Sequence, residues 1–237
     1  MKNRLIVALD KPSLASAKEL IAELGNSVSF YKVGLELFLN SKGKVVDFLQ
    51  ANNKKIFLDL KFHDIPNTVA QAARWAAGLG VDMFNVHASG GEEMLLNTME
   101  TVKTTAAQNG TAPPKVVAVT VLTSFNENGF AQMSHRYTIR ETVLSWADIC
   151  QKAGLDGVVC SPQEVIDIKE TCGPTFLTVC PGVRPLGSET QDQKRIMTPG
   201  AAIKNGVDYL VIGRPIIQDP NPQLAAKKIL EEMEGQG

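Results

Sequence analysis

The chain has 237 residues, 44% of them hydrophobic, and a formal net charge of −1 at pH 7. A chain of this length buries roughly 70% of the surface that it exposes when unfolded, so it needs neither disulfides nor a structural metal to fold. The near-neutral charge argues against nucleic acid or an anionic membrane as a partner, because both call for a basic excess.

Short apolar runs recur along the chain, and each is followed by a stretch with the spacing of a helix. Nearly continuous apolar strands are typical of a parallel sheet covered by helices. Eight such units without a linker predict one domain over residues 1–237, an α/β fold formed by a single (β/α)8 TIM barrel of parallel strands with helices outside. The predicted strands are residues 5–10, 29–34, 55–61, 83–88, 115–122, 157–161, 175–180 and 209–213.

Two of the predicted helices carry clear end signals. Ser13 can cap a helix over residues 15–24, and Gly25 follows its last residue. A second helix is predicted over residues 67–79 and stops at Gly80.

The longest irregular stretches are residues 123–138 and 181–198, and both directly follow strands. Loops at the C-terminal ends of barrel strands build active sites, so we interpret both as candidate lids. Plain surface loops are the alternative.

The cysteines and the N-terminal segment indicate in which cellular compartment the protein is expected. No Cys-x-x-Cys pair occurs and no His follows at a zinc spacing, which predicts buried, reduced thiols. The first apolar run is five residues long, too short for a signal peptide, and no segment reaches membrane-spanning length. We therefore expect a cytoplasmic protein that uses no membrane. The cysteines are Cys150, Cys160, Cys172 and Cys180.

Charged and polar residues gather at the C-terminal ends of the predicted strands. Such a charge is costly to bury unless it is paired, and this end of a barrel carries the catalytic groups of enzymes with this fold. We interpret the group as a site; a buried ion-pair network that only closes the barrel is the alternative. Its members are Asp10, Lys32, Asp59, Lys61, His87 and Thr123.

The third predicted strand supplies the centre of this group. Asp59 and Lys61 are two residues apart and point to the same face, toward the barrel mouth, whereas Leu60 faces the helices. Lys32 lies on the neighbouring strand, about 5 Å across the sheet, and Asp64 follows the strand. The sequence predicts an alternating array of two lysines and two aspartates.

The segment Asp-Leu-Lys-Phe-His-Asp-Ile-Pro-Asn-Thr at residues 59–68 resembles the signature of the orotidine 5'-phosphate decarboxylase family, and the resemblance extends over the whole chain. It implies decarboxylation of orotidine 5'-phosphate to uridine 5'-phosphate and CO2 in de novo pyrimidine biosynthesis, with neither metal nor organic cofactor. The further matching segments are Leu9-Asp10, Lys32-Val-Gly34, Leu122-Thr-Ser124, Pro181-Gly-Val-Arg184, Gln193 and Ile212-Gly-Arg214.

The resemblance also implies residue roles. Lys61 stabilises and protonates the C6 carbanion, and Lys32, Asp59 and Asp64 complete the catalytic set. It further implies a homodimer in which Asp64 and Thr68 reach the partner's site. The substrate-binding residues that it implies are Asp10 and Lys32 at the ribose, Thr123 and Ser124 at the pyrimidine, Arg184 and Gln193 at the phosphate and base, and Thr68.

A phosphate site follows from the fold without the resemblance. Barrels commonly hold a phosphate between the loops after strands 7 and 8, where Arg184 and Gly213-Arg214 stand. Pro215 suits the first turn of a short helix whose amides would face an anion. A solvated loop cation is the alternative for Arg184.

Three polar residues near this group can also be explained by structural roles. Asp10 can instead cap the helix that starts near Ser13. His63 and His87 are candidate general bases, but histidines beside a polar cluster more often form hydrogen bonds that hold other site residues in place.

Two other functions stay open. Magnesium-dependent sugar-phosphate decarboxylases and synthases of the same superfamily resemble the Asp-x-Lys-x-x-Asp motif, but they typically carry a carboxylate where Lys32 stands, and a cation there disfavours a divalent ion. The other alternative is a non-catalytic nucleotide-binding module.

Overall fold

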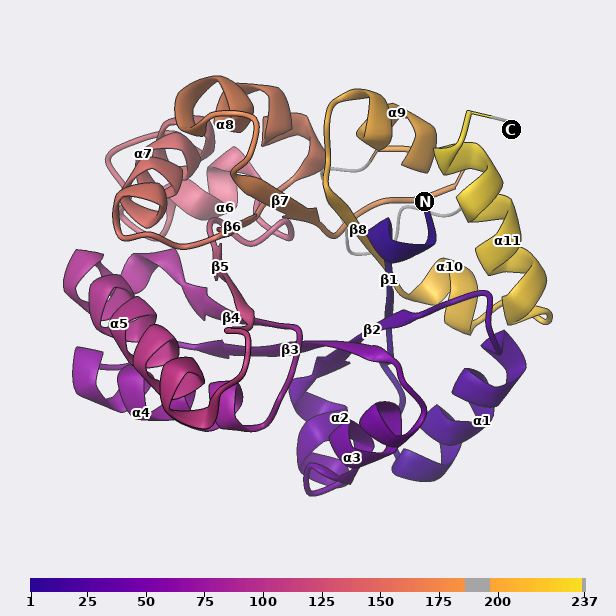
Figure 1. Ribbon diagram of the computed structural model, residues 1–237. Helices are drawn as coiled ribbons and strands as arrows, with labels where there is room; N and C mark the ends of the chain where they lie inside the picture. Colours follow the sequence, from indigo (N-terminus) through magenta and orange to yellow (C-terminus); the bar gives the residue numbers. More distant parts are fainter. Residues whose placement is uncertain (186–196, 236–237) are drawn as a thin grey trace.

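Eight parallel strands close into a barrel in the computed structural model, which describes residues 1–185 and 197–235 (Figure 1). Each strand pairs with its neighbours in sequence, and β8 pairs with β1. Seven of the eight predicted runs contain a strand completely and β3 extends one residue past its run, so the predicted (β/α)8 barrel is confirmed. The strands are β1 Leu5–Ala8, β2 Phe30–Gly34, β3 Lys55–Phe62, β4 Met83–His87, β5 Lys115–Val119, β6 Gly157–Val159, β7 Leu177–Cys180 and β8 Tyr209–Ile212.

Helices surround the ring of strands (Figure 1). The α-helices are α1 Leu14–Leu24, α2 Leu35–Asn40, α3 Lys44–Ala51, α4 Pro66–Gly78, α5 Glu92–Asn109, α6 Glu127–Ala131, α7 Ile139–Lys152, α8 Val165–Cys172, α9 Pro199–Lys204, α10 Arg214–Ile217 and α11 Pro222–Met233. Short 3-10 helices are η1 Lys2–Arg4, η2 Ala88–Gly90 and η3 Pro162–Glu164. In the described part of the chain, no helix is long and apolar enough to cross a membrane.

The two helices with clear end signals start and stop within one residue of the prediction. The Ser13 side chain accepts a hydrogen bond from the Ser16 N–H at the start of α1. Ser13 is therefore the cap of this helix, and the interpretation of Asp10 as its cap is wrong.

The predicted loop at residues 123–138 contains the short helix α6, which the sequence analysis missed. Asn126 caps it by accepting a hydrogen bond from the Gly129 N–H at 2.9 Å, and Phe130 is buried. A five-residue helix shows no repeat of apolar spacing, so a periodicity argument cannot detect it.

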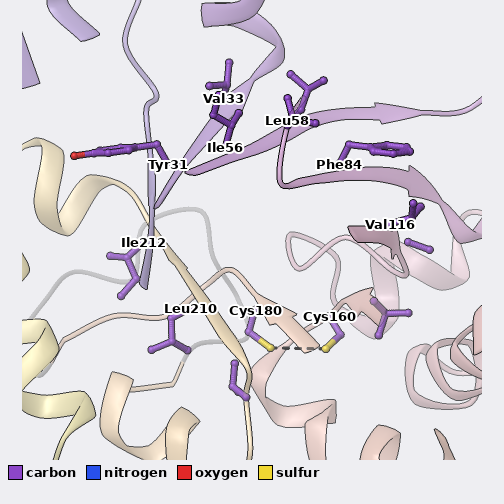
Figure 2. Close-up of a cluster of buried hydrophobic side chains, with 14 of the residues drawn as sticks. Tyr31, Val33, Ile56, Leu58, Phe84, Val116, Cys160, Cys180, Leu210 and Ile212 are labelled. Carbon is purple, nitrogen blue, oxygen red and sulfur yellow. Dashed lines mark hydrogen bonds between the residues drawn. The ribbon is translucent and has the colours of Figure 1, made fainter. Parts of the chain in front are cut away.

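Alternation along the strands divides the buried side chains into two clusters, one inside the barrel and one between barrel and helices. Figure 2 shows part of the outer cluster, with residues from β2 to β8. On β3, Ile56 and Leu58 belong to the outer cluster and Leu60 packs against it, as predicted, while Phe57 belongs to the inner one. The row that begins with Phe57 continues to Asp59 at the barrel mouth. The inner cluster consists of Ile6, Ala8, Phe30, Phe57, Met83, Val117, Val179 and Val211.

The four cysteines are buried and form no disulfide with one another, which confirms the predicted burial. Cys160 and Cys180 belong to the outer cluster, with their Sγ atoms 3.7 Å apart (Figure 2). Burial raises the pKa of the Cys150 thiol to about 12, so this thiol stays protonated at neutral pH.

A Gly-x-Asp motif precedes β4, β6 and β8, and the sequence analysis did not identify it. The aspartates are Asp82, Asp156 and Asp208. The Oδ2 atom of each accepts a backbone N–H of the preceding strand at 2.8 Å. The backbone N–H of each aspartate in turn donates to the carbonyl of the strand residue whose N–H its side chain accepts, at 3.0–3.2 Å. This repeated two-bond contact joins neighbouring strands where they enter the barrel.

Replacing Asp156 with alanine should destabilise the fold without touching the site. The buried Val116 N–H would lose the carboxylate that it contacts at 2.8 Å, and an unsatisfied buried donor costs about 1–3 kcal/mol. Urea denaturation should show that loss in the free energy of unfolding. The matched control is Asp148→Ala, because Asp148 pairs with Lys152 on the surface of α7 and its loss should change stability by less than about 0.5 kcal/mol. Equal stability of the two variants would contradict the assigned role.

Candidate active site

Four charged side chains form one ion-pair chain at the barrel mouth, from the segment after β1 and from β2 and β3. The Nζ atom of Lys32 lies 3.2 Å from Oδ1 of Asp10 and 3.1 Å from Oδ2 of Asp59. The Nζ atom of Lys61 lies 2.6 Å from Oδ1 of Asp59. Carboxylates and ammonium groups alternate, so each buried charge has an opposite neighbour.

The inner members of the ion-pair chain stay charged although they are buried. Burial alone would lower the pKa of Lys32, but the charges of Asp59 and Asp10 outweigh it and raise that pKa above its usual value. Burial alone would raise the pKa of Asp59, but the charges of Lys32 and Lys61 and two hydrogen bonds hold it below its usual range. Lys61 is the more open of the two lysines, with 39% of its side chain exposed against 12% for Lys32.

The strand β3 is irregular at the point where it carries these charges. Its pairing with β4 shifts between Leu58 and Phe62, so residues 59–61 lie opposite Asn85 alone. Lys61 has φ +53°, in the left-handed region, which costs a residue other than glycine about 1–2 kcal/mol. The irregularity turns the backbone at Lys61, one residue before the strand ends.

Asn85 bridges Asp59 and Lys61 of β3. Its Oδ1 accepts the Lys61 backbone N–H at 2.8 Å, and its Nδ2 donates to Oδ1 of Asp59 at 2.7 Å. Asn85 is 1% exposed. The sequence analysis missed it, although an amide within the apolar run of β4 was a signal that could have found it.

Two cavities of about 280 and 310 Å³ are both lined by Lys32, Asp59 and Lys61. Thr123 and Ser124 line the first, and the structure thus brings them to the ion-pair chain, with Thr123 buried. Asp10 lines the second.

The loops after β7 and β8 carry the predicted phosphate residues. Arg184 is 6% exposed and its Nη1 donates to the carbonyl of Val183 at 3.2 Å, so its interpretation as a solvated loop cation is wrong. Arg214 is half-buried at the start of α10, which has proline in its first turn as predicted. A Cβ at Gly213 would lie 3.3 Å from Oδ2 of Asp10, so glycine permits a close approach there. The predicted Gln193 lies outside the described residues.

The structure does not bring Asp64 into the ion-pair chain of this molecule. Asp64 is exposed, and its Oδ1 accepts the N–H of Ile65 at 2.7 Å. Thr68, in the first turn of α4, is exposed as well. Asp10 is instead the second carboxylate beside Lys32.

The two histidines near the site lie against each other, with the ring centroids of His63 and His87 5.1 Å apart. Burial, followed by the electrostatic effects of His63 and Lys61, lowers the pKa of His87, which favours its neutral imidazole. Across residues 1–185 and 197–235, no three His, Cys, Asp or Glu side chains are grouped so that they could hold a metal ion.

Comparison with known proteins gives a consistent picture. A family model described as "Orotidine 5'-phosphate decarboxylase / HUMPS family" matches residues 3–229. The chain is 51% identical to an orotidine 5'-phosphate decarboxylase of Nostoc sp., over 98% of this chain and 97% of that one. It is 47% identical to the Moorella thermoacetica protein of the same name, over 98% and 93%. The crystal structure of orotidine 5'-phosphate decarboxylase from Lactobacillus acidophilus superposes with a TM-score of 0.85 at 38% identity, covering 97% of this chain and 98% of that one.

Proposed function

The chain belongs to the orotidine 5'-phosphate decarboxylase / HUMPS family, and on this premise we propose that it converts orotidine 5'-phosphate to uridine 5'-phosphate and CO2 in pyrimidine biosynthesis. The observation that carries the proposal is the contact of the Lys61 ammonium with Asp59, at 2.6 Å, beside a cavity at the barrel mouth. A fixed cation at the edge of a cavity suits a reaction that develops negative charge on a bound ring.

The proposed chemistry needs no group beyond this chain and its substrate. The bond between C6 and the carboxyl carbon breaks, CO2 leaves, and the electron pair stays on C6. The Lys61 ammonium stabilises that charge and donates its proton to C6. Asp59 holds the ammonium in place, and Lys32 helps to keep Asp59 ionised.

The remaining residues are assigned to parts of the substrate. We place Asp10 and Lys32 at the ribose, because both line the second cavity, and Thr123 and Ser124 at the pyrimidine, because both line the first. The phosphate and base residues are Arg184, Gln193, Gly213 and Arg214.

A homodimer is part of the proposal. Asp64 and Thr68 are exposed beside the exposed side chain of Ile65, and so are available to a second copy of the chain. We propose that both reach the partner's site. Sedimentation of the purified protein would test the dimer.

The proposed function is tested by mixing the purified protein with orotidine 5'-phosphate and following the ultraviolet absorbance of the pyrimidine, with and without EDTA. We expect complete conversion to uridine 5'-phosphate at the same rate in both samples. Loss of turnover in EDTA would favour a magnesium-dependent relative. Binding of the nucleotide without a change in absorbance would favour a non-catalytic module.

Replacing Arg214 with alanine should weaken the binding of uridine 5'-phosphate about 10- to 100-fold, because a hydrogen bond to a charged group contributes about 1.5–3 kcal/mol. Binding of uridine, which has no phosphate, should not change. Calorimetric titration of both ligands measures the difference. Arg140→Ala is the matched control, since Arg140 is exposed and paired with Asp167 away from the mouth. An equal affinity of the Arg214 variant and the native protein for uridine 5'-phosphate would contradict the assignment.

A further inference from the structure

The register shift of β3, a bulge at residues 59–61, includes Lys61 in its left-handed conformation, which surrounding contacts must hold. In a regular parallel pair, a backbone N–H of one strand donates to a carbonyl of the next. Residues 59–61 lie opposite Asn85 alone, so the regular ladder is interrupted there. The Lys61 N–H donates instead to the side chain of Asn85, at 2.8 Å.

Chemistry fixes which way the Asn85 amide points. The Lys61 N–H can only donate, and the ionised carboxylate of Asp59 can only accept. The oxygen of the amide must therefore face Lys61 and its nitrogen must face Asp59, as the distances of 2.8 and 2.7 Å have it. The oxygen and the nitrogen of this buried amide thus each form a hydrogen bond with one of the two residues, Lys61 and Asp59.

We infer that Asn85 is a positioning residue for Lys61, an inference that rests on the proposed decarboxylation. The direction of the ammonium depends on the backbone of Lys61 at one end and on Oδ1 of Asp59 at the other. Asn85 holds the first by accepting the N–H and the second by donating to the same oxygen that receives Nζ of Lys61. One amide thus sets the start and the end of the lysine side chain.

Substitutions of similar shape lose one or both of these contacts at neutral pH. Leucine has the same branched arrangement of side-chain heavy atoms as asparagine but offers neither a donor nor an acceptor. Aspartate offers the acceptor, but its charge would face that of Asp59. A protonated aspartic acid would restore both contacts, because its carbonyl accepts and its hydroxyl donates. That difference allows a test that a purely structural role would not satisfy.

The first variant is Asn85→Leu. Displacement of a reacting group by about 1 Å costs about a hundredfold in rate, so kcat should fall by that factor. The affinity for uridine 5'-phosphate, which has no departing carboxyl group, should stay within about threefold. Steady-state kinetics and calorimetric titration measure the two, and circular dichroism verifies the fold.

The second variant is Asn85→Asp, and it serves even if the leucine variant fails to fold. Two adjacent carboxyl groups raise the pKa of one of them. Its protonated form is present below that raised pKa and is lost as the pH rises through it. The ratio of kcat in the variant to kcat in the native enzyme should therefore be about 0.01 at pH 8 and increase as the pH falls to 5.

The matched control is Thr98→Val, which removes another buried hydrogen-bonding side chain, on α5 and away from the mouth. Its kcat should equal that of the native enzyme. If the native protein decarboxylates the substrate and the aspartate variant has a ratio near one, or a low ratio that does not change with pH, the inference is overturned and the proposed function stands. Failure of the native protein to turn over would overturn both.

Discussion

Replacing Lys61 with alanine should abolish product formation and leave the binding of uridine 5'-phosphate measurable. Electrostatic stabilisation of a developing anion contributes about 10²–10³-fold, and a positioned general acid about 10²–10⁴-fold. One ammonium supplies both in the proposed reaction, so kcat should fall by about 10⁴–10⁷-fold. The fold should survive, because Asp59 keeps its contact with Lys32 at 3.1 Å.

Single-turnover kinetics at saturating substrate measure the chemical step, and titration with uridine 5'-phosphate measures binding. Lys152→Ala is the matched control, because Lys152 is an exposed lysine that is paired with Asp148 at 2.6 Å on α7. That variant should behave as the native protein. A kcat of the Lys61 variant within tenfold of the native value would remove Lys61 from the mechanism.

The strands were predictable because burial on both faces leaves nearly continuous apolar runs in the sequence. The residues at which the strands end were harder to predict. The run at residues 115–122 stays apolar beyond the last ladder partner, Val119, so hydropathy alone extends the strand too far. The Gly-x-Asp motif, by contrast, is visible in the sequence at Gly80-Val-Asp82 and at two further places. Its role, however, depends on which strand lies beside each aspartate in space.

The composition of the ion-pair chain was predicted only in part. Asp59, Lys61 and Lys32 meet as expected, because period-two alternation and strand adjacency determine their positions. Asp10 was expected at the ribose, and it also pairs with Lys32 because the register of β1 and β2 sets Ala8 opposite Lys32. Register in a parallel pair is a property of two strands, so neither sequence alone reveals it.

The bulge at residues 59–61 could not be predicted at all. It arises from the pairing of β3 with β4, and the sequence of β3 contains no glycine that would signal a left-handed residue. Lys61 adopts φ +53° although no local preference favours it. Strained residues of this kind persist where surrounding contacts determine them, and they gather at functional sites.

The charge of Asp59 has two possible roles in the proposed reaction, and their sizes differ. Repulsion of the substrate carboxylate by Asp59, at about 4 Å and an effective dielectric constant near 20, amounts to about 4 kcal/mol. Enzymes lower barriers by about 8–23 kcal/mol. Repulsion can therefore supply only part of that reduction, and we propose that Asp59 acts mainly by holding the ammonium of Lys61.

Replacing Asp59 with asparagine should consequently lower kcat by about 10²–10³-fold, less than the loss of Lys61 itself. The 4 kcal/mol of repulsion corresponds to about 10³-fold, which bounds that part of the effect. Single-turnover kinetics on both variants should give this order. If repulsion governed the reaction, the substrate would also bind more tightly to the asparagine variant, whereas the positioning role leaves its affinity unchanged or weaker. An asparagine variant that matches the Lys61 variant in kcat would contradict the ranking.

The same substitution should destabilise the protein, since removing one partner of a buried ion pair costs about 3–5 kcal/mol. The pKa of Asp59 lies below its usual value of 3.8 in the folded state, so its contribution is complete above that value and is lost as the pH falls through the lower, folded pKa. Urea denaturation should therefore show a constant gap between native protein and variant from pH 8 to about pH 5, closing only in stronger acid. A gap that closed near pH 6 would mean that the stabilising charge titrates there, and Asp59 would then not be the ionised centre that holds both lysines.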